Sequence, residues 1–94
     1  MQPAVYILAS GRYGTWYVGA CKDLLTRIYQ HRSEGGGWFS SKYRTHRLVW
    51  YEACDDFDAA FNYECVLKNW KRQWKIELIQ KMNPEWEDLY SRLL

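Results

Sequence analysis

The sequence predicts an α+β or mixed-layer fold, in which a small, mainly antiparallel sheet packs against helices in the order β-β-α-β-α-α-α. Near the N-terminus, two short strand-like runs flank a glycine-containing loop, which is the pattern of a hairpin. A third such run follows three successive glycines, and helical periodicity fills the remainder. With 94 residues and a hydrophobic content of 48%, the chain can bury one modest core. Residues 1–94 are therefore predicted to form a single domain.

The predicted hairpin places two tyrosines on one face of the sheet. "AVYILAS" is rich in β-branched and aromatic residues and predicts a strand over Ala4–Ala9, followed by the loop "GRYG" and the strand "TWYVGA". If the loop has four residues, Tyr6 lies opposite Gly19 and shares its face with Tyr17. A register slip of one residue would separate the two phenols. They are either ordinary core tyrosines or part of a site beside the side-chain-free Gly19.

The helix that follows brings a cation and a histidine to the border of its apolar side. Asp23 is a suitable N-cap for a helix that runs to about Ser33. At ~100° per residue, Arg27 and His31 stand next to each other on this helix. One interpretation is a guanidinium that extends to solvent beside a structural histidine. The other is a phosphate-binding fork beside a group that accepts a proton near neutral pH.

A glycine-rich loop precedes the third strand. "SEGGGWFSSKYRTH" cannot hold a helix cheaply, and it mixes cations such as Lys42 with aromatic residues. That mixture fits single-stranded or distorted nucleic acid, although the aromatic side chains could equally pack into the core. The run "RLVWYEA", residues 47–53, then predicts a strand.

The C-terminal half is predicted to be helical. Acidic residues in "DDFD" suit a helix N-terminus, and the helical pattern extends from Phe57 to about Met82, as one helix or as two with a break near Lys71. A last short helix is predicted from Pro84 to the end of the chain, because proline is favoured in a first helical turn.

One carboxylate stands among lysines on this helical pattern. Glu64, Lys68, Lys71 and Lys75 share a face if the helix is continuous. This is either a solvated face with a weak Glu64–Lys68 pair, worth ~0.3–0.5 kcal/mol, or a basic ridge along a phosphate backbone. In the second case the carboxylate could hold a hard cation such as Mg²⁺.

Composition limits the other classes of function. The formal net charge of +2 neither demands nor excludes a polyanionic partner. Three cysteines without paired spacing, and only two histidines, do not form a zinc pattern and fit reduced thiols in the cytoplasm. No signal-peptide pattern and no apolar run approaching ~20 residues is seen, so we expect no membrane partner and a cytoplasmic location.

Five stretches together resemble one known family. "VYIL", "WYVG", "DLLTRIYQHR", "YECVLKNWKRQWKIELI" and "NPEW" occur in the order and spacing of GIY-YIG nucleases, and most resemble the small standalone members, from about Ala4 to Leu89. The resemblance implies a three-stranded antiparallel sheet flanked by helices. Val5 departs from the pattern by replacing the first glycine, and Val18 replaces isoleucine.

The resemblance also implies site residues by position in the motifs. The candidate catalytic residues are Tyr6, Tyr17, Arg27, His31 and Glu64, and Glu64 is also the candidate metal ligand. The candidate nucleic-acid-binding residues are Gly19 and Asn83, which match family positions, and the cations Lys42, Lys68, Lys71 and Lys75.

The implied activity is endonucleolytic hydrolysis of DNA with a single divalent cation, Mg²⁺ or Mn²⁺. Arg27 would stabilise the negative charge of the transition state. Tyr6 would act as general base if nearby cations lower its pKa from about 10, with Tyr17 and His31 shaping the water network.

Two alternative functions remain open at the level of sequence. One is a catalytically silent nucleic-acid-binding module on the same fold, and the other is a protein-interaction domain that uses the six tryptophans. For the nuclease, the expected partner is nucleic acid, with DNA favoured. Since the chain is short, we also expect its own surface or a protein partner to supply substrate specificity.

Overall fold

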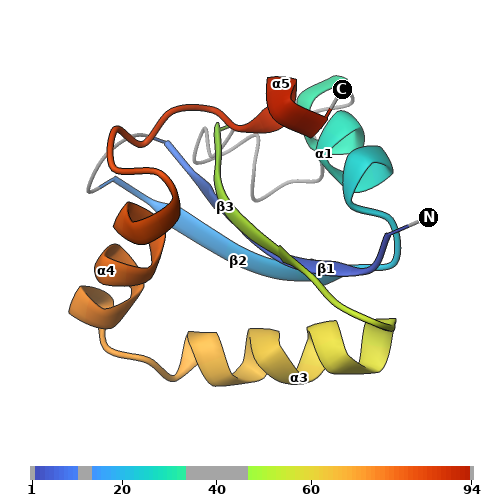
Figure 1. The fold of residues 1–94 in the computed structure, drawn as a ribbon, viewed down its shortest axis with the longest axis horizontal. Helices are drawn as coiled ribbons and strands as arrows, with labels where there is room; N and C mark the ends of the chain where they lie inside the picture. Colours follow the sequence, from blue (N-terminus) through green and yellow to red (C-terminus); the bar gives the residue numbers. More distant parts are fainter. Residues whose placement is uncertain (1, 11–13, 34–46, 94) are drawn as a thin grey trace.

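The computed structural model describes residues 2–10, 14–33 and 47–93, with the side chains of residues 31–33 outside this description. The described elements follow the predicted order and agree with the predicted α+β class (Figure 1). They are β1 (Ala4–Ala9), β2 (Trp16–Cys21), α1 (Leu24–Ser33), β3 (Arg47–Ala53), α3 (Phe57–Lys68), α4 (Arg72–Met82) and α5 (Tyr90–Leu93).

The sheet is antiparallel throughout, with β1 in the centre and the strand order β2-β1-β3. The predicted hairpin register is confirmed, since Tyr6 pairs with Gly19 and Leu8 pairs with Tyr17. Beyond the strands, the Ser10 amide donates to the Thr15 carbonyl at 3.0 Å and closes the hairpin ladder. In the described sheet, β2 is an edge strand whose hydrogen-bonded strand neighbour is β1.

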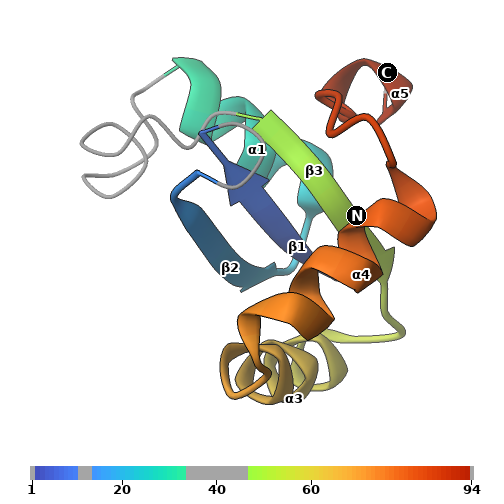
Figure 2. The ribbon, with the colours of Figure 1, turned by 90° about the vertical axis from the view of Figure 1, so that its left-hand side faces the viewer.

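Helices cover both faces of the sheet, so the molecule has three layers (Figures 1 and 2). Alternate residues of β1 point to opposite faces, and every residue of β1 is buried. One apolar cluster joins one face to α3 and α4: Val5, Ile7, Ala9, Val18, Val49, Trp50, Leu67, Ile79 and Trp86. The other joins the opposite face to α1 and the C-terminal segment: Ala4, Tyr6, Leu8, Cys21, Leu24, Ile28, Leu48 and Leu89.

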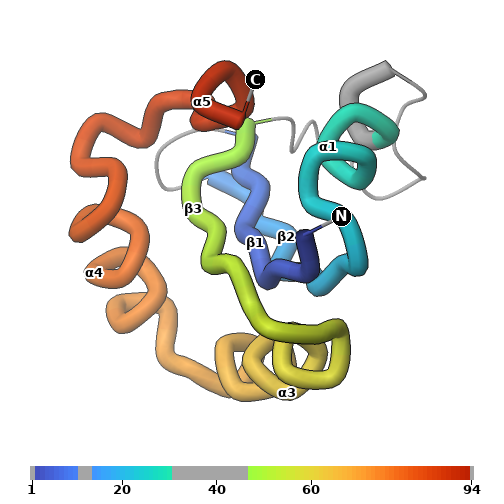
Figure 3. Tube along the Cα trace, turned by 45° about the vertical axis from the view of Figure 1, so that its right-hand side comes forward, coloured from blue at the N-terminus to red at the C-terminus, as the bar shows by residue number. Residues whose placement is uncertain are grey.

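The chain turns a corner between α3 and α4 (Figure 3). Helix α3 ends at Lys68, where the side chain of its C-cap Asn69 donates to the Cys65 carbonyl at 2.9 Å. Lys71, the N-cap of α4, has extended backbone angles. The break expected near Lys71 is thus confirmed, and the alternative of one continuous helix is wrong.

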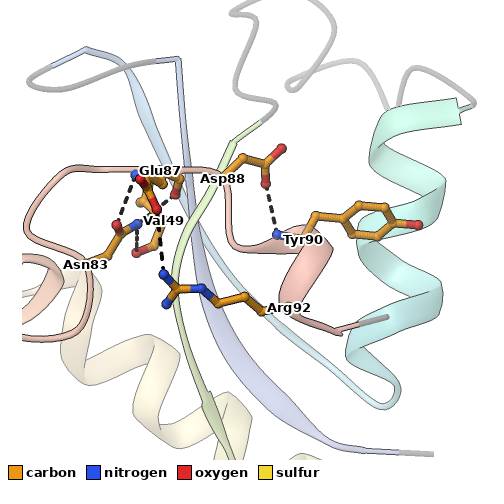
Figure 4. Close-up of polar contacts among 6 residues, drawn as sticks. All are labelled: Val49, Asn83, Glu87, Asp88, Tyr90 and Arg92. Atoms are coloured by element: carbon orange, nitrogen blue, oxygen red, sulfur yellow. Dashed lines mark hydrogen bonds and ion pairs between the residues drawn. The ribbon is translucent and has the colours of Figure 1, made fainter.

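The last predicted helix is wrong at its start: α5 begins at Tyr90 and not at Pro84. The side chain of Asn83 accounts for much of this difference (Figure 4). Its Oδ1 accepts the Glu87 amide at 3.0 Å, and its Nδ2 donates to the Glu87 carbonyl at 2.7 Å and to the Val49 carbonyl at 3.1 Å. A helix would need the Glu87 amide for the backbone carbonyl of Asn83. Trp86 also has a φ of 56°, which is incompatible with a right-handed helix.

Candidate active site

Two tyrosine rings form the centre of the candidate site. Tyr6 on β1 and Tyr17 on β2 lie on the same face, with ring centroids 6.2 Å apart and planes inclined by 44°. Tyr6 is buried, with 1% of its surface exposed, and Tyr17 is half-buried at the edge of the sheet. A diagonal pair across antiparallel strands produces this contact, as the predicted register requires.

Gly19 provides room for the phenol of Tyr6. A Cβ atom at this position would lie 2.6 Å from the Tyr6 hydroxyl oxygen and 3.0 Å from Cε1 of Tyr17. The space that the sequence leaves beside Gly19 is thus filled by the Tyr6 ring and is not an empty gap. Gly19 is itself buried beside the two tyrosines, so the structure gives it a packing role in place of the predicted contact with nucleic acid.

Helix α1 presents Arg27 on the tyrosine side of the sheet. Leu24 and Ile28 are buried and anchor the helix, which leaves the Arg27 side chain exposed on the wall of an open pocket of about 420 Å³. The positive charge of Arg27 acts on Tyr6 and opposes the rise in the pKa of its phenol that burial causes. His31 lies one turn further along α1, but its side chain is outside the described residues, as is Lys42.

Helix α3 packs against β2 and carries Glu64, whose charge acts on the Tyr6 phenol. Asp56 caps the helix by accepting the Ala59 amide at 2.8 Å, and buried Ala60 and Leu67 fix its inner side. The Glu64 side chain is only 14% exposed, and its Oε2 lies 2.6 Å from Nζ of Lys68. This ion pair raises the pKa of Lys68.

The pKa of Tyr6 is raised well above its usual range. Burial is the largest cause, and the neighbouring Tyr17 and the charge of Glu64 act in the same direction. Arg27 opposes them but is outweighed. The sequence-based expectation that cations lower this pKa is therefore not met by Arg27, and Tyr6 keeps its proton at neutral pH.

The residues present fit a hard divalent cation that has one protein carboxylate. Among the described residues, no group of three or more His, Cys, Asp or Glu side chains comes together. Glu64 supplies a carboxylate whose charge reaches the Tyr6 phenol, and Mg²⁺ suits such a site because it keeps several waters and takes phosphate oxygens as ligands. A cation at Oε2 of Glu64 would compete there with the ammonium of Lys68.

A basic groove adjoins the tyrosine pair along β2. It has a volume of about 640 Å³ and is lined by Gly14, Thr15, Trp16, Tyr17, Val18, Lys68, Arg72 and Lys75. Lys68 and Lys75 thus share a surface, as the sequence predicts. Lys71 does not line the groove, and its Nζ lies 5.6 Å from the centre of the Trp74 ring. Arg72, four residues after Lys68, lines the groove instead of Lys71. The sequence did not single it out, because a continuous helix would place Lys71 on this face.

Asn83 is not available to nucleic acid in this structure. Its side chain is 3% exposed, and its amide makes the three hydrogen bonds to Val49 and Glu87 described above. The expectation that Asn83 binds nucleic acid is therefore replaced by a structural role, which fixes the segment between α4 and α5 to strand β3.

Known proteins agree with this fold. The solution NMR structure of the UPF0213 protein BH0048 from Bacillus halodurans is 30% identical, with a TM-score of 0.57, and the match covers 94% of this chain and 93% of that one. The UPF0213 protein SSP2268 from Staphylococcus saprophyticus is 32% identical over 68 residues, which are 72% of this chain and 83% of the relative. The UPF0213 protein SERP0126 from Staphylococcus epidermidis is 29% identical over the same length.

The family assignment follows from the match of residues 2–77 to the GIY-YIG catalytic domain, which includes both tyrosines, Arg27 and Glu64. In the described part of the chain, no helix is long and apolar enough to cross a membrane. This chain belongs to the GIY-YIG catalytic domain family.

Proposed function

We propose that this protein is an endonuclease that hydrolyses DNA phosphodiester bonds with a single divalent cation, Mg²⁺ or Mn²⁺. The observation that carries the proposal is the Tyr6–Tyr17 ring pair on one face of the sheet, with Arg27 of α1 and Glu64 of α3 near enough for their charges to act on the Tyr6 phenol. Membership of the GIY-YIG family supports the same reaction class. We further propose that residues 1–94 act as one cytoplasmic domain, whose specificity comes from its surface or a protein partner.

Glu64 is the residue that would hold the cation. When bound, the cation supplies Lewis-acid stabilisation of the phosphate and of the departing oxygen. Arg27, exposed at the mouth of its pocket, contacts the scissile phosphate with a permanently charged, planar fork. Its charge stabilises the additional negative charge that develops as water attacks.

Tyr6 is the proposed general base, with Tyr17 and His31 ordering the attacking water. Because burial raises the pKa of Tyr6, its phenol must lose a proton before it can accept one. Positive charge is the factor that favours this loss, and Arg27 already acts in that direction. A Tyr6 base therefore predicts a cleavage rate that rises with pH well above neutrality.

A nuclease assay tests the proposal. Linear, nicked, flapped and branched DNAs are incubated with Mg²⁺, Mn²⁺ or EDTA, using wild type, Glu64→Gln and Arg27→Ala. We expect metal-dependent cleavage that Glu64→Gln abolishes while circular dichroism stays native. Arg27→Ala should lower turnover by roughly 10²–10³-fold with a smaller effect on DNA binding. Cleavage retained in both variants would remove these assignments.

One observation favours a second candidate, a catalytically silent nucleic-acid-binding module. Lys68 already neutralises the carboxylate of Glu64 at 2.6 Å, as a resident cation would. The silent module predicts salt-sensitive binding of DNA without cleavage of any substrate. It also predicts that Glu64→Gln leaves every measured property of the protein towards DNA unchanged.

A further inference from the structure

Three cations from two helices meet in the groove beside β2. Lys68 ends α3, Arg72 begins α4, and Lys75 lies one turn further along α4. The turn at Asn69–Lys71 separates the helices, yet all three side chains line one groove of about 640 Å³. The opposite wall runs from Gly14, before β2, to Val18 within it.

Arg72 is held in place across this groove by two contacts with the hairpin. Its Nη2 donates to the Gly14 carbonyl at 3.2 Å, and its guanidinium carbon lies 3.9 Å from the centre of the Trp16 ring. The guanidinium thus covers one face of the indole, and that face is closed to a stacking base. At this point the groove therefore presents positive charge to a ligand.

Lys75 is the second positive charge that lines the groove. It is half-buried, and burial together with the neighbouring charges of Arg72 and Lys68 lowers the pKa of its ammonium. Cations held this close repel one another, so a bound anion would remove the repulsion. The groove therefore has the electrostatics of an anion site.

The groove is continuous with the candidate active site. Tyr17 lines it, and Lys68 bridges it to Glu64. Resting on the nuclease function proposed above, we propose that Arg72 and Lys75 each bind a backbone phosphate of the nucleic acid strand, next to but separate from the cleaved phosphate. The contact is made to phosphate oxygens and reads no base.

Salt-dependent binding tests this site without cleavage. Labelled DNA duplexes of two unrelated sequences are titrated with Glu64→Gln protein in EDTA over a series of NaCl concentrations, with fluorescence anisotropy as the signal. Lys75→Gln, added to this background, should weaken binding about tenfold at low salt. It should also reduce the slope of log K against log salt by about 0.9, the value for one phosphate contact, equally for both sequences. Arg72→Gln should do the same.

Lys81→Gln is the matched control, because Lys81 lies on α4 beside Trp74 and Leu78, away from the groove. It should leave both affinity and slope unchanged. If Arg72→Gln fails to fold because its hairpin contacts are lost, Lys75→Gln carries the test, since no hydrogen bond or ion pair of the Lys75 side chain is seen among the described residues.

Four outcomes would overturn the site. Binding unchanged by Lys75→Gln while the wild-type protein still cleaves DNA removes the groove and leaves the nuclease intact. If Lys81→Gln loses as much DNA affinity as Lys75→Gln, the loss follows from net charge and not from the groove. A loss that depends on DNA sequence contradicts backbone recognition. Competition by polyglutamate as strong as that by DNA of equal charge points to an acidic protein partner. If the protein binds DNA with this salt dependence but cleaves none, the proposed nuclease function fails and the phosphate site stands.

Discussion

At the scale of single residues, Gly19 shows how closely the tyrosine pair is packed. A methyl group there would approach the Tyr6 hydroxyl oxygen to 2.6 Å and the Tyr6 Cζ to 2.7 Å. Tyr6 is 1% exposed, so its ring has little room to move away. The glycine is thus needed for packing at the point where the chemistry is proposed to occur.

We expect Gly19→Ala to destabilise the protein by about 1–3 kcal/mol through overpacking. Urea unfolding measures the free energy, and the same substitution in a Tyr6→Phe background supplies the control. Loss of the hydroxyl relieves the closest of the contacts, so the alanine should cost less in that background. Equal costs in both backgrounds would show that the Tyr6 hydroxyl is not the group that Gly19 accommodates.

Lys68 is the second residue whose role can be tested alone. Its ammonium and a divalent cation would compete for the same carboxylate oxygen of Glu64. We expect Lys68→Gln to bind Mn²⁺ about tenfold more tightly than wild type, because a charge-assisted hydrogen bond no longer has to be broken. Titration followed by electron paramagnetic resonance, without DNA, measures this affinity.

Lys71→Gln serves as the control for this change, since Lys71 lies over Trp74 and not at Glu64. It should leave Mn²⁺ affinity unchanged. Weaker Mn²⁺ binding in Lys68→Gln than in wild type would contradict competition at Glu64 and assign Lys68 a supporting role.

At the scale of elements, the segment between α4 and α5 depends on one side chain. Asn83 bonds the backbone of Glu87 and the carbonyl of Val49 on β3 (Figure 4). We expect Asn83→Ala to lower the free energy of unfolding by about 2–3 kcal/mol, because the buried Val49 carbonyl and the partly buried backbone groups of Glu87 lose their partners. Urea denaturation measures this loss.

Asn69→Ala is the comparison for that measurement, since the exposed Asn69 side chain donates one described hydrogen bond, to Cys65. It should cost about 0.5–1 kcal/mol. DNA affinity of the folded Asn83→Ala protein should equal that of wild type. A selective loss of DNA affinity with native stability would restore Asn83 as a nucleic-acid contact.

At the scale of the whole molecule, a buried phenol and a buried thiol lower the free energy of unfolding at high pH. Burial raises the pKa of the Tyr6 phenol above its usual range and the pKa of the Cys21 thiol to about 11. In the unfolded chain the thiol ionises near 9 and the phenol near 10. The unfolded state therefore releases protons first as pH rises, and folding stability falls.

We expect the free energy of unfolding to be fully present below about pH 8 and to decline from about pH 9 upward. Chemical denaturation at a series of pH values measures the decline. With Tyr6→Phe, the free energy of unfolding should fall less steeply above about pH 10. Tyr51→Phe is the control, since Tyr51 is a half-buried tyrosine on the adjacent strand. An unchanged slope in Tyr6→Phe would contradict burial of a neutral phenol.

The sequence alone determined the order of the elements, the hairpin register and the grouping of Tyr6 with Tyr17. These depend on local patterns: alternation along short strands, turn residues between them, and helical spacing. Matching motifs in order then identified the GIY-YIG family, and the position of Glu64 and Arg27 in the motifs selected them as candidates.

Only the tertiary structure decided which of these residues face one another. Lys71 leaves the basic face and Arg72 joins it because three residues between α3 and α4 turn the chain. Asn83 moves inward because β3, more than 30 residues earlier, offers the carbonyl of Val49 as a partner. Burial by the surrounding layers raises the pKa of Tyr6 against the charge of Arg27. The Asn83 and Tyr6 results depend on segments distant in the chain, and the basic groove depends on its distant wall at residues 14–18, so local patterns do not contain them.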